Sequence, residues 1–436
     1  VSVDTSSLTV ADGNVTTDGY SFDQTLVIAG TTITGQTVDL NTLTLTGGGL
    51  KDSSTNATLS ISGTSNTDID TLDATGLASD LNITALDTGS AAAISMGDTG
   101  NKITIGLGDA ARDAVDIDGG GGTDTIVFSD MATGTYRPGA TNVEKLDVDV
   151  ADNTAQSGAV TLHLGDATSV TSVELAFDGG DENVTVSGAG SVTSYVLGGA
   201  QALTSDIVNL GSSGTLAISN ESAVGSTALA LETPDATDLT VKLGNTSNMA
   251  FHTITAAKAT SLTIGGTDAD SAGTQYAGNI SATTVTAGEA VTINIDSNQG
   301  AVSVPTLTAA KATSLTIVGD NAVTIGGTAA TTTLLATIDA STTSGGVTIG
   351  SAVDLTSTAN VTLGTAADTL TLDILTESNV VVNAGEHATT DTGVNDTLSL
   401  AGANNQGLTV VDLSSTTDQV TQINGAVNTA AITNFE

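Results

Sequence analysis

Cysteine and tryptophan are absent from the chain, and the aromatic residues are limited to four Tyr and five Phe. Without cysteine the protein cannot form disulfides, bind zinc through thiolates or use a thiol nucleophile. The shortage of aromatic side chains argues against a large aromatic-lined pocket, a stacked cofactor or an aromatic platform for sugars. The apolar content is therefore Ala, Val, Leu and Ile, which suits a thin β-rich core.

Positive charge is also scarce, with 8 Lys and Arg against 48 Asp and Glu, which gives a formal net charge of −40. Such a surface repels the phosphates of nucleic acids and the headgroups of anionic lipids, so we expect no nucleic-acid partner. No run of 18 apolar residues is present, so we expect no membrane insertion. Cations are the natural counter-ligands of this chain.

Charged residues make up only 13% of the 436 residues, and the mean hydropathy is +0.19. This is not the composition of a disordered chain, so we expect a folded protein. No basic segment followed by an apolar one marks a signal peptide at the start, so we expect the sequence to be a fragment of a longer chain or to use an export signal located elsewhere.

Short runs in which Val, Ile or Leu alternates with Thr, each ending in Gly or Asp, fill most of the sequence. Examples are LTLTGG from Leu43, LTVKLG from Leu239 and VTIGG from Val323. Because Thr is β-branched and polar, this alternation predicts strands with one buried and one solvated face. Helix signals are nearly absent, so the expected fold class is all-β.

The strand starts recur at an interval of roughly 22–24 residues. The pairs that show this interval are Leu59 and Leu81, Leu81 and Ile103, Leu239 and Leu262, Val291 and Leu315, and Val323 and Val347. Coils of this length predict a parallel β-helix or β-roll-like solenoid, in which each coil buries its apolar side chains against its neighbours. Tandem β-sandwich domains remain the alternative.

Two internal duplications bear on the organisation of the chain. TAAKATSLTI occurs at residues 255–264 and again at 308–317, an offset of 53 residues that equals roughly two coils. TNVE at residues 141–144 and TNFE at 433–436 each follow a segment rich in Gly or Asp, although short Thr/Asn strings also recur by chance. We expect two blocks, residues 1–145 and 146–436.

The sharpest motif is GGGGTDTIV at residues 119–127, which fits the nonapeptide G-G-x-G-x-D-x-U-x. Its glycines let the backbone turn tightly so that carbonyl oxygens point inward, and Asp124 adds a carboxylate suited to a hard cation. Ile126 and Phe128 then begin a buried strand. The alternative is a turn in which Asp124 only caps local N–H groups.

This motif resembles the RTX calcium-binding repeats of bacterial exoproteins exported by type I secretion. The resemblance implies Ca²⁺ at Asp124, with the carbonyls of Gly120 and Gly122, in a calcium-stabilised β-roll. Only this nine-residue copy is a full match; degenerate turns occur at residues 106–113, 177–186, 363–372 and 389–400. The acidic, cysteine-free, strand-dense texture is most similar to the S-layer and surface-matrix members of that group.

The candidate calcium ligands are the acidic and glycine residues of these turns: Asp116, Asp118, Gly120, Gly122, Asp124, Asp109, Asp113, Asp178, Asp181, Asp368 and Asp396. Acidic residues at alternate strand positions, such as Asp147 and Asp149, more often form a solvated face.

Catalytic signatures are missing. His163, His252 and His387 form no HExxH pair, no G-x-S-x-G elbow occurs, and only two arginines are available to stabilise an anionic transition state. We expect a non-enzymatic, extracellular, cell-surface protein that assembles with copies of itself in a calcium-dependent S-layer or matrix. Cell-surface polysaccharide is a second candidate partner. The alternatives are a calcium-dependent adhesin and a β-helical enzyme acting on polysaccharides.

Overall fold

The computed structural model describes part of the chain, namely residues 2–4, 25–27, 40–47, 57–60, 69–77, 81–106, 115–131, 133–150, 159–177, 183–199, 207–224, 229–267, 277–326, 331–332, 335–351, 353–373, 380–385, 396–401, 409–412, 419–423, 426–427 and 432–433. The chain divides into two compact units, which are described separately. Unit 1 comprises residues 1–195 and 211–213, and unit 2 comprises residues 196–210 and 214–436.

The strands form an all-β parallel solenoid with about 23 residues per turn, which confirms the expected fold class. No helix occurs in the described part of the chain, and accordingly no helix there could cross a membrane. The alternative of tandem β-sandwiches is wrong, because sandwich strands pair in antiparallel fashion whereas nearly all pairs here are parallel. The expected block boundary at residues 145 and 146 stays a prediction.

Unit 1 stacks its strands in three parallel sheets, and the long strand β6 belongs to two of them. Its strands are β1 (Ser2–Asp4), β2 (Thr25–Val27), β3 (Leu40–Gly47), β4 (Ala57–Ser60), β5 (Ile69–Leu77), β6 (Leu81–Ser95), β7 (Lys102–Gly106), β8 (Val115–Asp118), β9 (Thr125–Met131), β10 (Gly134–Tyr136), β11 (Gly139–Thr141), β12 (Lys145–Val150), β13 (Ala159–His163), β14 (Ser172–Phe177), β15 (Asn183–Ser187) and β16 (Ser194–Gly199), the last shared with unit 2.

Unit 2 has two long parallel sheets, which we name after one member each. The β22 sheet contains β18 (Thr215–Asn220), β20 (Asp238–Leu243), β22 (Ser261–Thr267), β24 (Thr292–Asp296), β27 (Ser314–Val318), β30 (Leu335–Asp339), β32 (Leu355–Thr362), β34 (Val381–Asn383) and β39 (Ile432–Thr433). The β23 sheet contains β17 (Ile207–Leu210), β19 (Ala230–Glu232), β21 (Met249–Thr255), β23 (Ile280–Thr286), β25 (Val302–Val304), β26 (Thr306–Ala309), β28 (Val323–Ile325), β29 (Thr331–Thr332), β31 (Val347–Ile349), β33 (Thr369–Asp373) and β35 (Thr397–Ala401). Three antiparallel strands follow: β36 (Thr409–Asp412), β37 (Gln419–Ile423) and β38 (Ala426–Val427).

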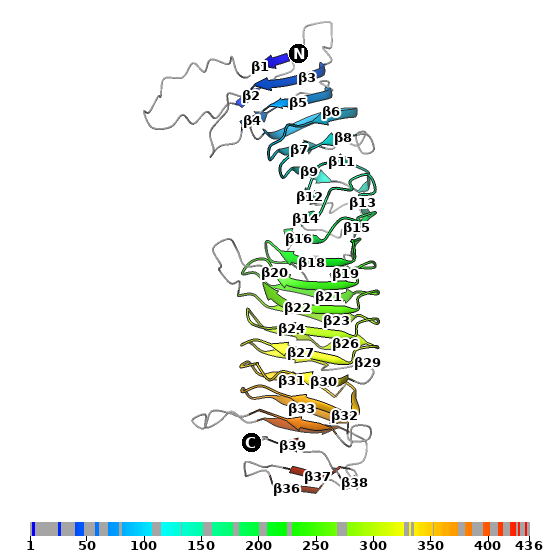
Figure 1. Cartoon of the computed structure of the whole chain (residues 1–436), viewed down its shortest axis with the longest axis vertical. Coiled ribbons are helices and arrows are strands. Elements are labelled where there is room, and N and C mark those ends of the chain that lie inside the picture. The colour runs from blue at the N-terminus through cyan, green and yellow to red at the C-terminus, as the bar shows by residue number, and fades with distance from the viewer. Residues whose placement is uncertain are drawn as a thin grey trace, which may run out of the picture. The chain divides into compact units, whose positions relative to one another are not determined.

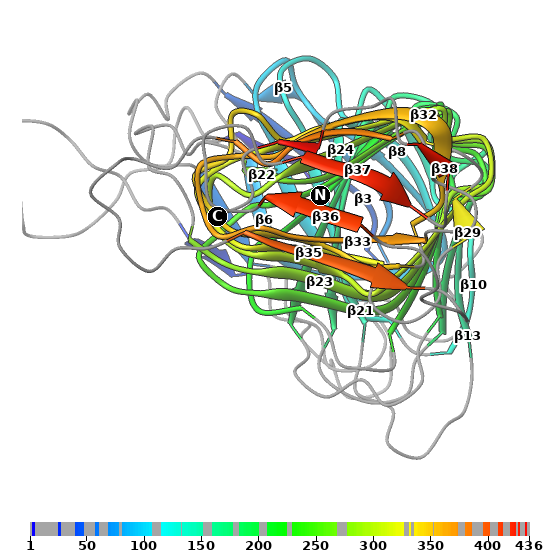
Figure 2. The same cartoon turned by 90° about the horizontal axis from the view of Figure 1, so that it is seen from below.

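In unit 2 the strands lie one above another like rungs (Figure 1), and a view along the stack shows β22, β24 and β32 on one side of the core and β21, β23 and β33 on the other (Figure 2). The Val/Ile/Leu positions of each rung point inward, and the Thr positions between them point outward. Leu262, Ile293, Leu315 and Ile338 form one such inner column and are all fully buried.

The TAAKATSLTI repeats lie two turns apart, as their offset predicts. Thr255 pairs with Thr286, and Thr286 pairs with Thr308, so a turn with the diverged sequence TAGEAVTINI lies between the two copies. In each copy an Ala-x-x-Ala segment closes the corner between the two sheets, for example through the N–H of Ala312, which donates to the carbonyl of Ala309 at 3.0 Å. The first and last alanine of this segment are fully buried in both copies.

Candidate cation site at a glycine-rich turn

The glycine-rich segment at residues 119–124 joins β8 to β9 and lies against the turn at residues 96–101 of the preceding coil. Gly120 and Gly122 have positive φ angles of 80° and 103°. A Cβ atom on Gly120 would lie 2.4 Å from the carbonyl oxygen of Gly97, and one on Gly122 would lie 2.6 Å from the carbonyl carbon of Thr99. Glycine is required because the two turns approach so closely.

Asp124 is fully buried at the end of this turn. Its Oδ1 accepts hydrogen bonds from the backbone N–H of Asn101 at 2.7 Å and from the side-chain amide of Asn101 at 2.8 Å. The backbone N–H of Asp124 donates to Oε2 of Glu144 at 2.8 Å. Asn101, Asp124 and Glu144 therefore form a polar column on three successive turns, each directly before a strand.

The side-chain nitrogen of Asn101 is surrounded by oxygen atoms from both turns. It lies 2.6 Å from the carbonyl oxygen of Thr99, 2.8 Å from Asp124 Oδ1, 3.2 Å from the carbonyl oxygen of Gly97 and 3.3 Å from that of Gly119. An amide group has only two hydrogens for these four oxygens. Three carbonyls and one carboxylate around a single centre is a donor set that hard cations also take.

The second carboxylate oxygen of Asp124, Oδ2, is buried and has no hydrogen-bond partner in the protein. Thr99 Oγ1, in the turn of the preceding coil, is also buried without a hydrogen-bond partner. Burial raises the pKa of Asp124 to about 6, the hydrogen bonds from Asn101 oppose this rise, and the nearby charges of Glu144 and Asp118 add to it. A bound cation would offset the cost of this buried charge.

The other acids of this segment take different roles. Asp118 Oδ1 accepts the N–H of Gly120 at 3.1 Å and the side-chain amide of Asn142 at 2.8 Å, which holds the start of the turn. Asp116 is exposed on β8. Asn142 itself has a positive φ of 54° and belongs to the TNVE segment, as does Glu144.

Asp368 and Asp396, 28 residues apart, are brought together on adjacent turns, and both are buried. Asp368 uses both carboxylate oxygens, since Oδ1 accepts the N–H of Val347 at 2.7 Å and Oδ2 that of Gly364 at 3.0 Å. Its own N–H donates to Asp396 Oδ1 at 2.8 Å. This geometry resembles that of Asp124 as a cap, but Asp368 has no spare oxygen of the kind found at Asp124.

Four of the candidate ligands, Asp109, Asp113, Asp178 and Asp181, lie outside the described residues. Within the described ranges, no group of three or more His, Asp or Glu side chains converges as a metal site. The oxygen atoms that converge near Asp124 are mostly backbone carbonyls, namely those of Gly97, Thr99 and Gly119, and not those of Gly120 and Gly122 that the RTX resemblance implies.

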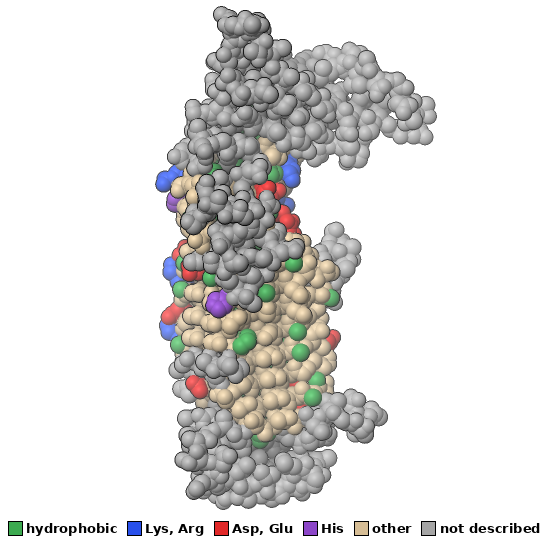
Figure 3. Space-filling model, turned by 180° about the vertical axis from the view of Figure 1, so that it is seen from behind, with side chains coloured by type: hydrophobic (Ala, Val, Ile, Leu, Met, Phe, Trp, Pro, Cys, Tyr) green, Lys and Arg blue, Asp and Glu red, His purple; other side chains and the backbone are tan. Residues whose placement is uncertain are grey.

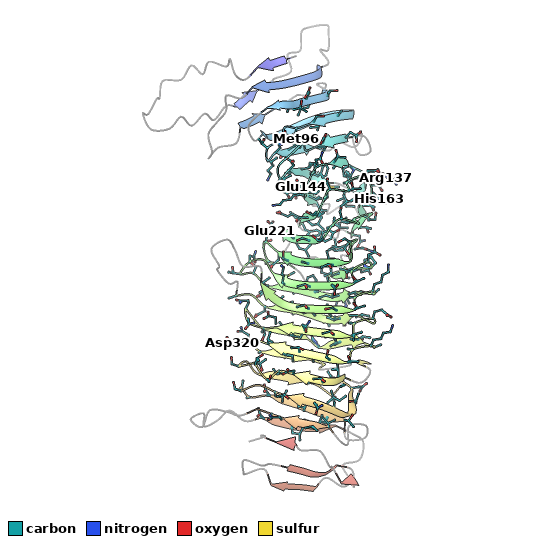
Figure 4. All side chains as sticks on the ribbon, in the orientation of Figure 1. Met96, Arg137, Glu144, His163, Glu221 and Asp320 are labelled. Carbon is teal, nitrogen blue, oxygen red and sulfur yellow. The ribbon has the colours of Figure 1, made fainter. Side chains whose placement is uncertain are left out.

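A second polar cluster lies in unit 1. Ser187 Oγ is hydrogen-bonded to Nδ1 of His163, its partner on the adjacent strand, and Arg137 follows Tyr136, which pairs with Leu162. Figure 4 shows Arg137 and His163 at one edge of unit 1 and Glu144 toward the opposite edge. In the part of the chain that the structure describes, no acid is hydrogen-bonded to His163, so the pair lacks the third member of a catalytic triad.

The chain matches no protein-family model, and comparisons with curated proteins and with solved structures give no significant match.

Sequence reasoning selected Asp124 and its glycines but missed Asn101, Asn142 and Glu144. Asn101 and Glu144 lie 23 and 20 residues from Asp124, close to one coil length in either direction. Two signals in the sequence could have identified these residues. One is the distance of about one coil from Asp124, and the other is the TNVE segment, which contains Asn142 and Glu144.

Proposed function

We propose that this protein is a structural, self-assembling extracellular surface-layer or matrix protein whose folding and assembly depend on calcium. The RTX-like turn, the solenoid of regular coils and the net charge of −40 support this proposal together. A solenoid exposes long, repetitive surfaces that suit contacts with copies of the same chain.

The observation that carries the proposal is the buried, unpartnered Oδ2 of Asp124, which lies in a turn stacked on the carbonyls of Gly97, Thr99 and Gly119 around Asn101. Isolated buried carboxylates are costly, and a divalent cation is the ligand that removes this cost and accepts carbonyl oxygens as well. Asp124 would hold the ion, and the carbonyls of Gly120 and Gly122 would complete its shell, as the RTX resemblance implies. The ion would supply charge neutralisation and cross-link successive coils.

Calcium would then act as a switch for folding. At low free calcium the excess negative charge keeps the chain expanded, and at millimolar calcium binding neutralises carboxylates and closes the turns. The same coupling would let the chain pass through type I secretion unfolded and fold at the cell surface.

Thermal unfolding with and without calcium tests the proposal. A ligand that binds only the folded state stabilises it by about 2.7 kcal/mol at 100 times its Kd, so millimolar calcium is expected to raise the Tm well above its value in chelator. An unchanged Tm after exhaustive chelation would contradict the proposal.

The variant Asp124→Asn tests the site, because it keeps the shape of the side chain and removes the carboxylate. We expect it to lose most of the calcium-induced rise in Tm. Asp238→Asn, which removes an exposed carboxylate on β20, is the matched control and should keep the wild-type response. An equal response of the two variants would show that Asp124 holds no ion.

A further inference from the structure

From β23 to β33, the outward side chains that the structure describes on the β23 sheet carry hydroxyl groups and no charge. From β23 to β33 the outward positions of the described strands, whose side chains are exposed or half-buried, are Ser281, Thr283, Thr284, Thr286, Ser303, Pro305, Thr306, Thr308, Thr324, Thr348, Thr369 and Thr371. Every one of these residues is uncharged, and all except the proline carry a hydroxyl. We call these residues, together with the half-buried Thr253 at the outward position of β21, the hydroxyl face.

The hydroxyl groups are arranged in columns because the strands pair without a shift of register. One column runs through Ser281, Ser303, Thr324, Thr348 and Thr369 on five successive turns. A parallel column runs through Thr253, Thr284 and Thr306. Neighbouring strands are about 4.7–4.9 Å apart, so the hydroxyl groups of a column repeat at that interval.

Most charged side chains that the structure describes in unit 2 lie away from these residues, and Glu232, also on the β23 sheet, is on β19, outside the hydroxyl face. The outward side of the β22 sheet carries Asp238, Lys242, Asp296 and Asp339. The corner between the sheets carries two ion pairs, Asp235 with Lys258 and Glu289 with Lys311. Figure 3 shows a face of unit 2 on which charged side chains are sparse in the middle and gather toward one edge.

We infer that the hydroxyl face is the surface through which one copy of this chain contacts a second copy; the inference rests on the proposed self-assembly and names its interface. Two chains that each carry a net charge of −40 repel one another, and the repulsion is weakest where neither presents a charge. A second copy also has the same interval between its rungs, so hydroxyl columns facing one another stay matched over several turns.

The size of the face shows what kind of contact it makes. Five rungs about 4.8 Å apart, with the two columns about 10 Å apart along the strands, cover a few hundred Å², below the roughly 800 Å² per partner of a standard interface. A single contact is therefore weak, and the face works through repetition in an array, where many equal contacts add.

Matched charge insertions test this assignment. The double variant Thr253→Asp with Thr306→Asp places two carboxylates in one column of the hydroxyl face. The control Thr263→Asp with Thr316→Asp places two carboxylates at half-buried outward positions of β22 and β27, in the same two turns on the opposite sheet. Both variants change the net charge equally, and equal Tm values would show that both fold.

Sedimentation of wild type and both variants, across protein concentration and with calcium or chelator, gives the readout. We expect the hydroxyl-face variant to weaken association at least about tenfold, since like charges across an interface are costly, and the control to associate like wild type. Equal association of the two variants, or a wild-type chain that stays monomeric in every condition, would overturn the assignment.

The same data separate this inference from calcium dependence. Association of wild type in chelator that only the hydroxyl-face variant abolishes would keep the interface and reject the role of calcium. A calcium-dependent association that both variants retain would keep calcium and reject the interface.

A single engineered cysteine gives a second measurement, because the chain has no native one. Under oxidation, Thr306→Cys is expected to form disulfide-linked dimers faster than Thr316→Cys on the opposite sheet. Equal rates for the two variants would contradict a contact at the hydroxyl face.

Discussion

At the scale of single residues, Asp124 couples the stability of unit 1 to pH. Its pKa is about 6 in the folded protein, against 3.8 for an ordinary Asp, so between these values the folded state binds more protons than the unfolded state. In chelator, the free energy of unfolding is therefore expected to fall as the pH rises from about 4 to about 6, by about 3 kcal/mol at most.

The difference between wild type and Asp124→Asn isolates this contribution from the general repulsion among acids, and urea unfolding at each pH measures it. Asp73 and Asp339 do not interfere in this window, because hydrogen bonds from Thr75 and Ser341 lower their pKa values, and their contribution is lost only at more acidic pH. A constant difference between the two proteins from pH 4 to pH 7 would contradict the raised pKa.

Asn101 places an amide nitrogen where four oxygen atoms converge, and its replacement by Asp should make the turn depend on a cation. The carboxylate of Asn101→Asp would face Asp124 Oδ1 and carbonyl oxygens without hydrogens to donate, so the variant is expected to have a lower Tm in chelator and a larger rise in calcium than wild type. Asn279→Asp, at an exposed position before β23, is the control. A calcium response of Asn101→Asp no larger than that of the control would show that the oxygens do not form a cation cage.

The candidate site was only partly predictable because its residues lie on three turns. The glycines and Asp124 are consecutive and form a recognisable pattern, whereas Asn101 and Glu144 are ordinary residues in their local sequence. Their role arises from stacking, which places each directly before a strand on the coil above or below Asp124.

At the scale of strands, the alternation of apolar and Thr residues correctly predicted which side chains point inward. It did not determine which residues pair between adjacent strands, since registers that differ by two residues fit it equally well. The expected matches of Leu239 with Leu262 and of Val323 with Val347 are confirmed. The expected match of Val291 with Leu315 is wrong, since Leu315 pairs with Ile293. Because a slip of two residues keeps every side chain on the same side of the sheet, the alternation alone cannot distinguish the two registers.

The same two-residue error affects the N-terminal coils, where Leu59 pairs with Ile83 and Ile83 with Ile103, so the expected matches through Leu81 are wrong. Register is determined at the corners between the sheets, because the number of residues in each corner and its close packing fix where the next strand begins. Corners such as the Ala-x-x-Ala turns were visible in the sequence only where they were duplicated.

The inner columns of unit 2 carry its stability. Leu315 is 0% exposed and lies between Ile293 and Ile338 of the adjacent turns. Leu315→Ala is expected to lower the free energy of unfolding by about 2–5 kcal/mol, through lost burial and a cavity. Thr316→Ala, at the adjacent outward position, should change it by only about 0.5 kcal/mol. Urea unfolding of both variants measures the difference, and similar losses would contradict the inward orientation of Leu315.

At the scale of the whole molecule, charge and repetition act against one another. Under the proposed self-assembly, the repeated rungs of the solenoid would favour contacts between copies, and the net charge of −40 would oppose any such contact until cations neutralise it. Divalent ions can bind carboxylates and close turns, whereas monovalent ions only screen. This difference separates calcium-coupled assembly from a general effect of salt.

The most direct test of the account is light scattering combined with negative-stain imaging of the chain in calcium, in chelator and in sodium at matched ionic strength. The account predicts ordered sheets or filaments in millimolar calcium and dispersed particles in the other two conditions. Dispersed monomers at every calcium concentration up to about 10 mM, well above the roughly millimolar affinity of weak extracellular sites, would contradict it.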